Sequence, residues 1–492
     1  MVQASVPENV ASTAAAPQRR RIERLRRTGR RPAAAEPWAR ILFLPPRLLL
    51  GLFLVTLVLP LGFSVGGLQL TPYTSMLIIF VIPAFVYWLQ HAPRVIVLDL
   101  CMLFYILWTG VAIYHNHGSS RLIFILNQTV TLFGAYMLGR VLVRDAASYR
   151  LMFTVLFWIL VALLPFALVE LLLSKSILAM VFGLPGASGG GLGGYRLGLR
   201  RVTSVFPHPI LFGVFCSILV SNFFYVFYER TRTRLARTLL AVMMTFISLS
   251  TGPNLSQLGQ LVLIAWERLF RIFVTKWAVL TVSVITLLAV LQLGYPGGLY
   301  AFLVENLAFN QTSGWGRLEI LVYGSQSVAR HPVFGIGLAP WNGPWWRTTS
   351  VDNFWMVTAI RYGLPALAFF WAGLAWHAVR IMSRGGLTEQ QTSYRKGYIF
   401  AAAGTIVALA AVHVWASVAI FILFYIGAGA WFYEGAAAPE PVRRRPDRTT
   451  DRPTGRLPRG QPSPAPAAAA TPPGRTGRII PRRPTARQDL PR

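Results

Sequence analysis

Acidic residues are scarce in this sequence. Aspartate and glutamate number 17 among 492 residues, against 47 lysines and arginines, so the formal net charge is +30. Charged residues make up only 13% of the chain, hydrophobic residues make up 54%, and the mean hydropathy is +0.51. A soluble domain carries about 25% charged residues on its surface. The composition therefore excludes a soluble globular protein and indicates a polytopic helical membrane protein.

Cysteines and metal-ligand patterns are also few. Cys101 and Cys216 each lie in an apolar run, which is typical of packed, inert thiols. His208, His331 and His413 do not have the spacing of metal ligands on one helix, so we expect neither a metal nor another cofactor. The first apolar run begins about 40 residues into the chain without a small-residue cleavage site after it, which is not the pattern of a signal peptide.

The two ends of the chain differ in composition from its middle. Residues 1–47 are rich in alanine and arginine, and residues 435–492 are a mixture of proline, arginine and alanine that cannot bury a core. Roughly half of the lysines and arginines lie in these tails. We expect both tails to be disordered, cytoplasmic and bound to anionic lipid headgroups, and we do not expect a nucleic-acid partner.

Apolar runs recur through residues 48–434, and about 20 helical residues cross the hydrocarbon of a bilayer. The pattern predicts an all-α transmembrane domain with about twelve spans. These are 48–63, 73–90, 95–115, 122–143, 151–173, 209–228, 238–250, 255–266, 276–293, 354–379, 397–413 and 416–432. The seventh and eighth are short, are joined by Thr251, Gly252, Pro253 and Asn254, and alternatively form a re-entrant hairpin.

Basic residues in the short connections indicate the orientation. If the arginine-rich N-terminus is cytoplasmic, nearly all short basic connections fall on the inner face, as the positive-inside rule requires. Both termini are then cytoplasmic, and the outer face receives two long loops, 174–208 and 294–352. The second loop has an aromatic-rich stretch from Trp315 that we expect to be non-helical. Loops of this length usually have a binding function.

Four acidic residues fall on the predicted outer face and are the first choices for a general base: Glu170, Glu305, Glu319 and Asp352. Asp352 precedes Asn353 and an apolar helix, so a helix N-cap is the alternative role for it. On a helical wheel Gly363 lies about 20° from Asp352, three turns further on. It would let a neighbouring segment approach closely on the same face.

Arginines are the second group of candidate site residues. A guanidinium group binds phosphate oxygens with a planar fork, so arginines on the outer loops suit a clamp for a lipid diphosphate. We expect Arg201 and Arg317 to be the main contacts. Arg361, two turns inside the tenth predicted span, should face the protein interior or a wet cavity, or snorkel to the surface. The arginines of the outer loops are Arg196, Arg200, Arg201, Arg317, Arg330 and Arg347.

These residues and their order resemble the O-antigen ligase and polysaccharide polymerase superfamily of bacterial inner membranes. The resemblance rests on Gly316-Arg317, RHPVFGIG from Arg330, Asp352-Asn353 and GLPA from Gly363, with an earlier RVTSVFPHP from Arg201. Aspartate stands where the family has a histidine, and STGPNLSQ at 250–257 has no arginine where ligases have an SRG-like motif. Both departures favour a polysaccharide polymerase over a ligase that attaches glycan to lipid A core.

The resemblance implies a metal-independent glycosyltransferase. It would transfer glycan from an undecaprenyl-diphosphate-linked donor to a glycan acceptor, or in a ligase to lipid A core, on the periplasmic side of the inner membrane. A transporter or flippase of lipid-linked sugars and a membrane scaffold remain alternative functions. The predicted catalytic residues are Asp352, Arg317 and Arg201, and the predicted substrate-binding residues are Arg200, Arg330, Asn353, Gly363 and Arg361.

Overall fold

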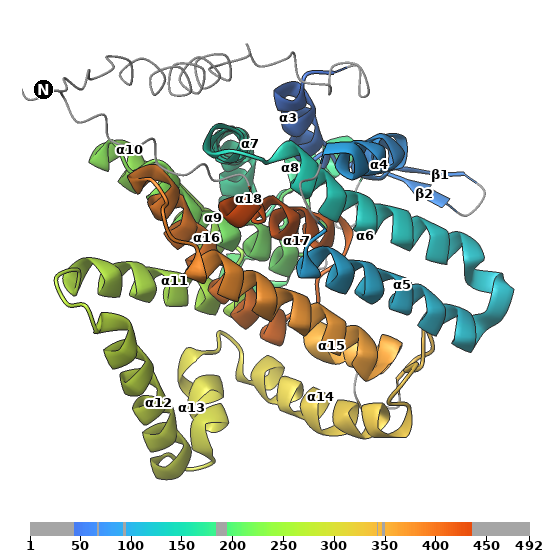
Figure 1. Cartoon of the computed structure of the whole chain (residues 1–492). Helices are drawn as coiled ribbons and strands as arrows, with labels where there is room; N and C mark the ends of the chain where they lie inside the picture. The colour runs from blue at the N-terminus through green and yellow to red at the C-terminus, as the bar shows by residue number, and fades with distance from the viewer. Residues whose placement is uncertain are drawn as a thin grey trace, which may run out of the picture. The chain divides into compact units, whose positions relative to one another are not determined.

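A computed structural model describes residues 44–65, 68–91, 95–183, 194–341, 343–346 and 350–434 (Figure 1). The predicted disordered tails, 1–47 and 435–492, therefore lie outside the described residues apart from 44–47, and so does Arg347. The described part is mostly helical, as predicted.

Two short antiparallel hairpins, β1 (Phe63–Val65) with β2 (Leu68–Leu70) and β3 (Tyr195–Arg196) with β4 (Leu199–Arg200), accompany the helices. The helices are α3 (Pro46–Thr56), α4 (Pro72–His91), α5 (Val97–His117), the 3-10 helix η1 (Gly118–Arg121), α6 (Leu122–Leu142), α7 (Ala146–Leu173), α8 (Ile177–Phe182), α9 (Pro209–Val226), α10 (Thr231–Phe246), α11 (Thr251–Leu269), α12 (Lys276–Gly294), α13 (Gly298–Leu307), α14 (Gln311–Arg330), α15 (Phe354–Ser383), α16 (Glu389–Ala411), α17 (Ala416–Ala428) and α18 (Trp431–Glu434).

Seven helical segments among the described residues are long and apolar enough to cross a membrane, and one of them, Val97–Leu142, contains both α5 and α6. All twelve predicted spans overlap a helix, but the number of spans stays a prediction. The helix in the first is short, since α3 ends at Thr56. The connection between the seventh and eighth lies at 247–250, one turn earlier than predicted, because Thr251 already begins α11.

Helix α9 lies at the centre of the packing. Nearly all of its side chains are buried, and it packs against α7, α10, α11, α16 and α17. Its polar side chains are paired across these contacts. Asn222 accepts a hydrogen bond from the Tyr149 hydroxyl at 2.8 Å and donates to the Tyr425 hydroxyl at 2.9 Å. Because a buried amide without partners is costly, this network favours one register of α7, α9 and α17.

A second polar network joins α9 to α11 and α16. Ser221 donates from its hydroxyl to Gln260 Oε1 at 2.7 Å, and Gln260 Nε2 donates to the Ser217 carbonyl at 2.9 Å. The Ser221 hydroxyl also lies 3.0 Å from the carbonyl oxygen of Gly397. These contacts fix the C-terminal half of α9 relative to two helices that come much later in the sequence.

A buried ion network joins α5, α6 and the last described residue. Arg140 on α6 donates from Nε to Asp99 at 2.8 Å and also pairs with Glu434, the last described residue. Tyr136 donates its hydroxyl to the same aspartate. Arg140 and Asp99 are both buried, so each depends on the other to offset the cost of leaving water.

The prediction of a non-helical stretch from Trp315 is wrong for residues 315–330, which belong to α14, whereas the described residues between 331 and 353 are non-helical. Asn310 caps this helix by accepting a hydrogen bond from the Ser313 amide at 2.8 Å. The buried face of α14, which packs against α13 and α15, is mostly small, and the search for large apolar residues missed it. It consists of Gly314, Gly316, Ile320, Gly324 and Ser327. The loop 294–352 therefore contains α13 and α14, and the loop 174–208 contains α8 and the β3–β4 hairpin.

Helix α12 stands apart from the bundle beside α13 (Figure 1). None of its residues is buried within the described structure, although it is one of the segments apolar enough to cross a membrane. An apolar helix exposed on all sides is suited to contact with lipid. This arrangement favours α12 as a membrane span that leads from the basic connection at 270–276 to the α13–α14 segment.

Cysteine labelling tests the predicted orientation. A side chain at Gly294, at the end of α12, or at Gly385, just after α15, would meet no atom within 4 Å. We expect Gly294→Cys to react with a membrane-impermeant maleimide in spheroplasts and Gly385→Cys to react only after permeabilisation. The parent protein gives the background from Cys101 and Cys216. If Gly385→Cys is labelled in intact spheroplasts and Gly294→Cys is not, the orientation is opposite to the predicted one.

Candidate functional site

The β3–β4 hairpin sorts its arginines onto two faces. Leu197 and Gly198 form the turn, both with positive φ (53° and 75°), as a two-residue hairpin turn requires. Because side chains alternate along a strand, Arg196 and Arg201 belong to one face and Arg200 to the other. The three arginines therefore do not act together, contrary to what their proximity in the sequence suggests.

Arg196 and Arg201 both bind the connection between α10 and α11. Arg201 donates from Nη2 to the Ser250 hydroxyl at 2.7 Å and from Nε to the Ser248 carbonyl at 3.4 Å. Arg196 donates to the carbonyl of Leu249 at 3.0 Å. Arg201 is buried. This connection thus holds two guanidinium groups side by side at the N-terminal end of α9.

Arg317 and Asp352 reach the same region from the second long connection. Arg317, in the second turn of α14, donates from Nε to the carbonyl of Ala411 at 2.8 Å. The amide of Phe354 donates to the next carbonyl, that of Val412, at 3.0 Å. The end of α16 therefore positions both Arg317 and the start of α15, which Asp352 immediately precedes.

The charges of these residues act on one another. The pKa of Arg201 is lowered to about 10, chiefly by burial and further by Arg196 and Arg317, while Asp352 acts in the opposite sense. The pKa of Arg196 is lowered by burial and by Arg317. Three positive groups, two from the hairpin and one from α14, thus share one site with a carboxylate. We call Arg196, Arg201, Arg317 and Asp352 the arginine cluster.

His208 is a member of this site that the sequence analysis did not select. It caps α9, because its Nδ1 accepts a hydrogen bond from the Ile210 amide at 3.2 Å. Burial and then the charge of Arg201 lower its pKa to about 4, while Asp352 opposes this shift. His208 is therefore neutral near pH 7. The position before Pro209, at the start of a buried helix, was the available sequence signal.

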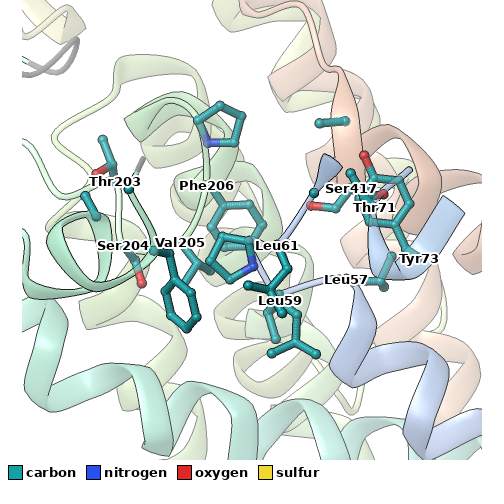
Figure 2. Close-up of a pocket in the computed structure, with 18 of the residues that line it drawn as sticks. Leu57, Leu59, Leu61, Thr71, Tyr73, Thr203, Ser204, Val205, Phe206 and Ser417 are labelled. Atoms are coloured by element: carbon teal, nitrogen blue, oxygen red, sulfur yellow. The ribbon is translucent and has the colours of Figure 1, made fainter. Parts of the chain in front are cut away.

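A pocket of about 630 Å³ is lined in part by residues 203–207 (Figure 2). These residues form the segment that joins Arg201 to His208 along the chain. No charged side chain occurs among its described lining residues, which include the hydroxyl groups of Thr71, Tyr73 and Ser417. The pocket thus offers neutral polar and aromatic groups beside a positively charged site.

Glu170 supports one wall of this pocket. Its carboxylate accepts hydrogen bonds from the Thr203 hydroxyl at 2.7 Å and from the backbone amides of Thr203 and Ser204 at 3.1 and 2.9 Å. Arg200 lies 3.8 Å from the same carboxylate and donates to the Ser174 carbonyl at 3.0 Å. Glu170 is buried, and its carboxylate fixes the backbone of residues 203–204. Arg200 is the ion-pair partner of this carboxylate.

The predicted cap and the actual cap of α15 differ by one residue. Asn353 accepts a hydrogen bond from the Met356 amide at 3.0 Å and is the N-cap, so the alternative that Asp352 caps the helix is wrong. Asp352 lies outside α15, and Gly363 has non-helical dihedrals (φ 81°, ψ 174°). The helical-wheel relation between Asp352 and Gly363 is therefore also wrong.

Gly363 does allow the close approach that was predicted, but at a kink. A Cβ atom there would overlap the carbonyl oxygen of Val333, and the next amide, that of Leu364, donates to the Pro332 carbonyl at 2.8 Å. The family-like segment from Arg330 to Gly337 thus packs directly on α15. Gly363 has a packing role that the structure explains without a ligand.

Of the two other predicted substrate-binding arginines, Arg330 lies away from these contacts, whereas the charge of Arg361 acts on His413, the residue after Val412. Arg330 is exposed in the last turn of α14, thirteen residues after Arg317 and so about 20 Å along the helix. Arg361 is exposed near the kink of α15, and its carbonyl accepts a hydrogen bond from the Gly337 amide at 2.9 Å. Within the described ranges, no group of three His, Cys, Asp or Glu residues is placed to hold a metal ion.

No protein-family model matches this chain, and no curated protein matches it. The resemblance to the ligase and polymerase superfamily therefore rests on the quoted motifs and stays a prediction.

Replacing Gly363 by alanine tests the kink. A positive φ costs an L-residue roughly 1–2 kcal/mol, and the overlap with the Val333 carbonyl adds to it. We expect Gly363→Ala to lose about 3 kcal/mol or more, seen as a large fall in the unfolding temperature in detergent. Gly385→Ala is the matched control, since its Cβ meets open space. Equal unfolding temperatures for the two variants would contradict the kink.

The lowered pKa of His208 predicts acid sensitivity. Its folded pKa of about 4 lies below the usual value of 6.5, so the unfolded chain binds the proton more tightly. Proton uptake by this histidine in the unfolded chain therefore lowers the free energy of unfolding as the pH falls from about 6.5 towards 4. His208→Asn keeps a capping acceptor and removes the titration. We expect its unfolding temperature to fall less steeply over this range than that of the parent; parallel curves would exclude His208 as the cause.

Proposed function

We propose that this protein is a membrane glycosyltransferase that polymerises polysaccharide repeats, transferring glycan from an undecaprenyl-diphosphate-linked donor to an acceptor sugar. One observation carries the proposal. Arg196 and Arg201 come from one hairpin, Arg317 comes from a helix more than a hundred residues later, and the three lie close enough to affect one another's pKa. Their positive charges outnumber the carboxylate of Asp352, and a bound anion would offset the repulsion between them.

A lipid-linked diphosphate is the anion that fits this place best. Its negative charge grows as the glycosyl bond breaks, and groups already fixed in position can stabilise that charge without reorganising. Arg201 is buried and Arg317 is half-buried, so both act in a medium that screens charge poorly. These two residues would bind the departing diphosphate.

The proposal assigns the role of general base to Asp352. It is half-buried and interacts electrostatically with Arg201 and His208. Because Asn353 already caps α15, Asp352 is available to accept the proton of the acceptor hydroxyl. The bond between sugar and diphosphate would break as the acceptor oxygen bonds to the sugar, with the proton passing to Asp352.

The neutral pocket beside the cluster supports a sugar substrate. Aromatic faces and hydroxyl groups are the usual partners of sugar rings, and both line this pocket (Figure 2). Its volume of about 630 Å³ falls in the range of small-molecule sites. A glycan could occupy it while its carrier diphosphate meets the arginines.

The same proposal includes the membrane arrangement. Twelve helices would span the bacterial inner membrane with both termini in the cytoplasm, and the arginine cluster would face the periplasm. Helix α9 supports this scheme, since the cluster lies at its N-terminal end and the basic connection of residues 227–237 follows its C-terminal end. The basic tails would contact anionic lipids on the inner face.

Polymerisation of lipid-linked repeats by purified variants tests the function. Arg317→Lys keeps the charge but loses the planar fork, and Asp352→Asn removes the base without removing the cap of α15. We expect the polymerisation rate to fall at least about tenfold in Arg317→Lys and about a hundred-fold or more in Asp352→Asn, while both unfolding temperatures stay unchanged.

Arg121→Lys is the control for this experiment, because Arg121 is exposed in η1 and is not part of the cluster. Near-parental activity of both Arg317→Lys and Asp352→Asn would refute the proposed site. Absence of polymer from the parent protein itself, with lipid-linked repeats supplied, would refute the function.

A further inference from the structure

A positively charged pocket lies at the other end of α9. It has a volume of about 450 Å³ and is lined by Arg150, Phe227, Glu229, Arg230, Thr233 and Arg237. Helix α9 has 18 residues, so its two ends are about 27 Å apart and this pocket is separate from the arginine cluster. The proposed transferase function does not use it.

The charges of this pocket do not balance. Three arginines against one glutamate leave two positive charges among the described lining residues. Arg150 and Glu229 form an ion pair. Burial lowers the pKa of Arg237, and the charge of Arg150 lowers it further, although Glu229 acts in the opposite sense. The repulsion between the arginines would be relieved by a bound anion.

The backbone adds to this positive field. The pocket lies at the N-terminus of α10, where Arg230 is the N-cap, and no side chain among the described residues makes a capping hydrogen bond there. The first amides of a helix point out of its end and carry a partial positive charge, which favours phosphate groups. The Thr233 hydroxyl, in the same first turn, supplies a further donor.

Aromatic rings hold one guanidinium group in place. Arg237 lies over the Phe227 ring at 3.8 Å from its centroid and over the Phe157 ring at 4.5 Å. Such stacking restricts the arginine side chain while leaving its edge free to bind oxygen atoms. The Phe227 ring also lines the pocket, and this apolar surface suits a ligand that has a hydrocarbon part next to its phosphate.

We propose that this pocket binds a phosphate group, either the headgroup of an anionic phospholipid or a soluble phosphate compound, through Arg230, Arg237 and the first turn of α10. Arg150 completes the positive wall and remains paired with Glu229. Phosphate oxygens accept from the guanidinium forks and from the helix amides together. The site requires no bond to be made or broken.

Binding to the purified full-length protein in detergent tests this site. Dioctanoyl phosphatidylglycerol, dioctanoyl phosphatidylcholine and inorganic phosphate are titrated separately at constant ionic strength, with calorimetry as the readout. We expect the parent protein to bind phosphatidylglycerol and not phosphatidylcholine. Arg230→Gln should weaken this binding about tenfold or more, as expected for one lost charge-assisted contact.

Arg230 is exposed, so its replacement spares the fold, and Arg237→Gln is the second variant. The matched control is Arg271→Gln, an exposed arginine in another basic connection, which should bind like the parent. Binding of inorganic phosphate with the same dependence on Arg230 supports the site with a soluble ligand. No binding by the parent, or equal weakening in Arg230→Gln and Arg271→Gln, overturns the proposal.

Discussion

The cost of keeping positive charge next to apolar helices is the constraint on which the rest of the structure depends. Arginines gather at both ends of the buried helix α9, and each group needs partners that the helix itself does not supply. At one end these partners are backbone carbonyls from the connections after α10 and after α16. At the other end they are a glutamate and aromatic rings.

The polar contacts inside the bundle determine where these ends lie. Asn222 joins α7, α9 and α17, and Gln260 joins α11 to α9. A shift of one helix by a turn would leave a buried amide without its partner, and such a loss costs about 1–3 kcal/mol. Hydrogen bonds made elsewhere in the core, by residues without charge, therefore determine where the carbonyls of Ser248, Leu249 and Ala411 meet the arginines.

How far the sequence predicts this molecule varies from element to element. Long apolar helices such as α7 and α9 follow directly from hydropathy, because lipid or protein surrounds them on every side. Hydropathy does not indicate helix α14, since apart from Ile320 its buried face is made of glycine and serine. Asp352 and Asn353 are both good caps, so composition could not decide between them. The pairing of Arg201 with Arg196, and not with Arg200, depends on hairpin register, which only the fold determines.

The scattered origin of the arginine cluster has a consequence for biogenesis. Arg201 and Arg317 are 116 positions apart (317 − 201), and Val412 follows 95 positions later (412 − 317). At about 5–20 residues per second, roughly 6–23 s pass between the synthesis of the two arginines. During that interval Arg196 and Arg201 lack Arg317, and Arg317 in turn lacks its carbonyl partner until α16 has been made. The site is thus complete only after α16 has been made, and a nascent chain that ends before α16 cannot form it.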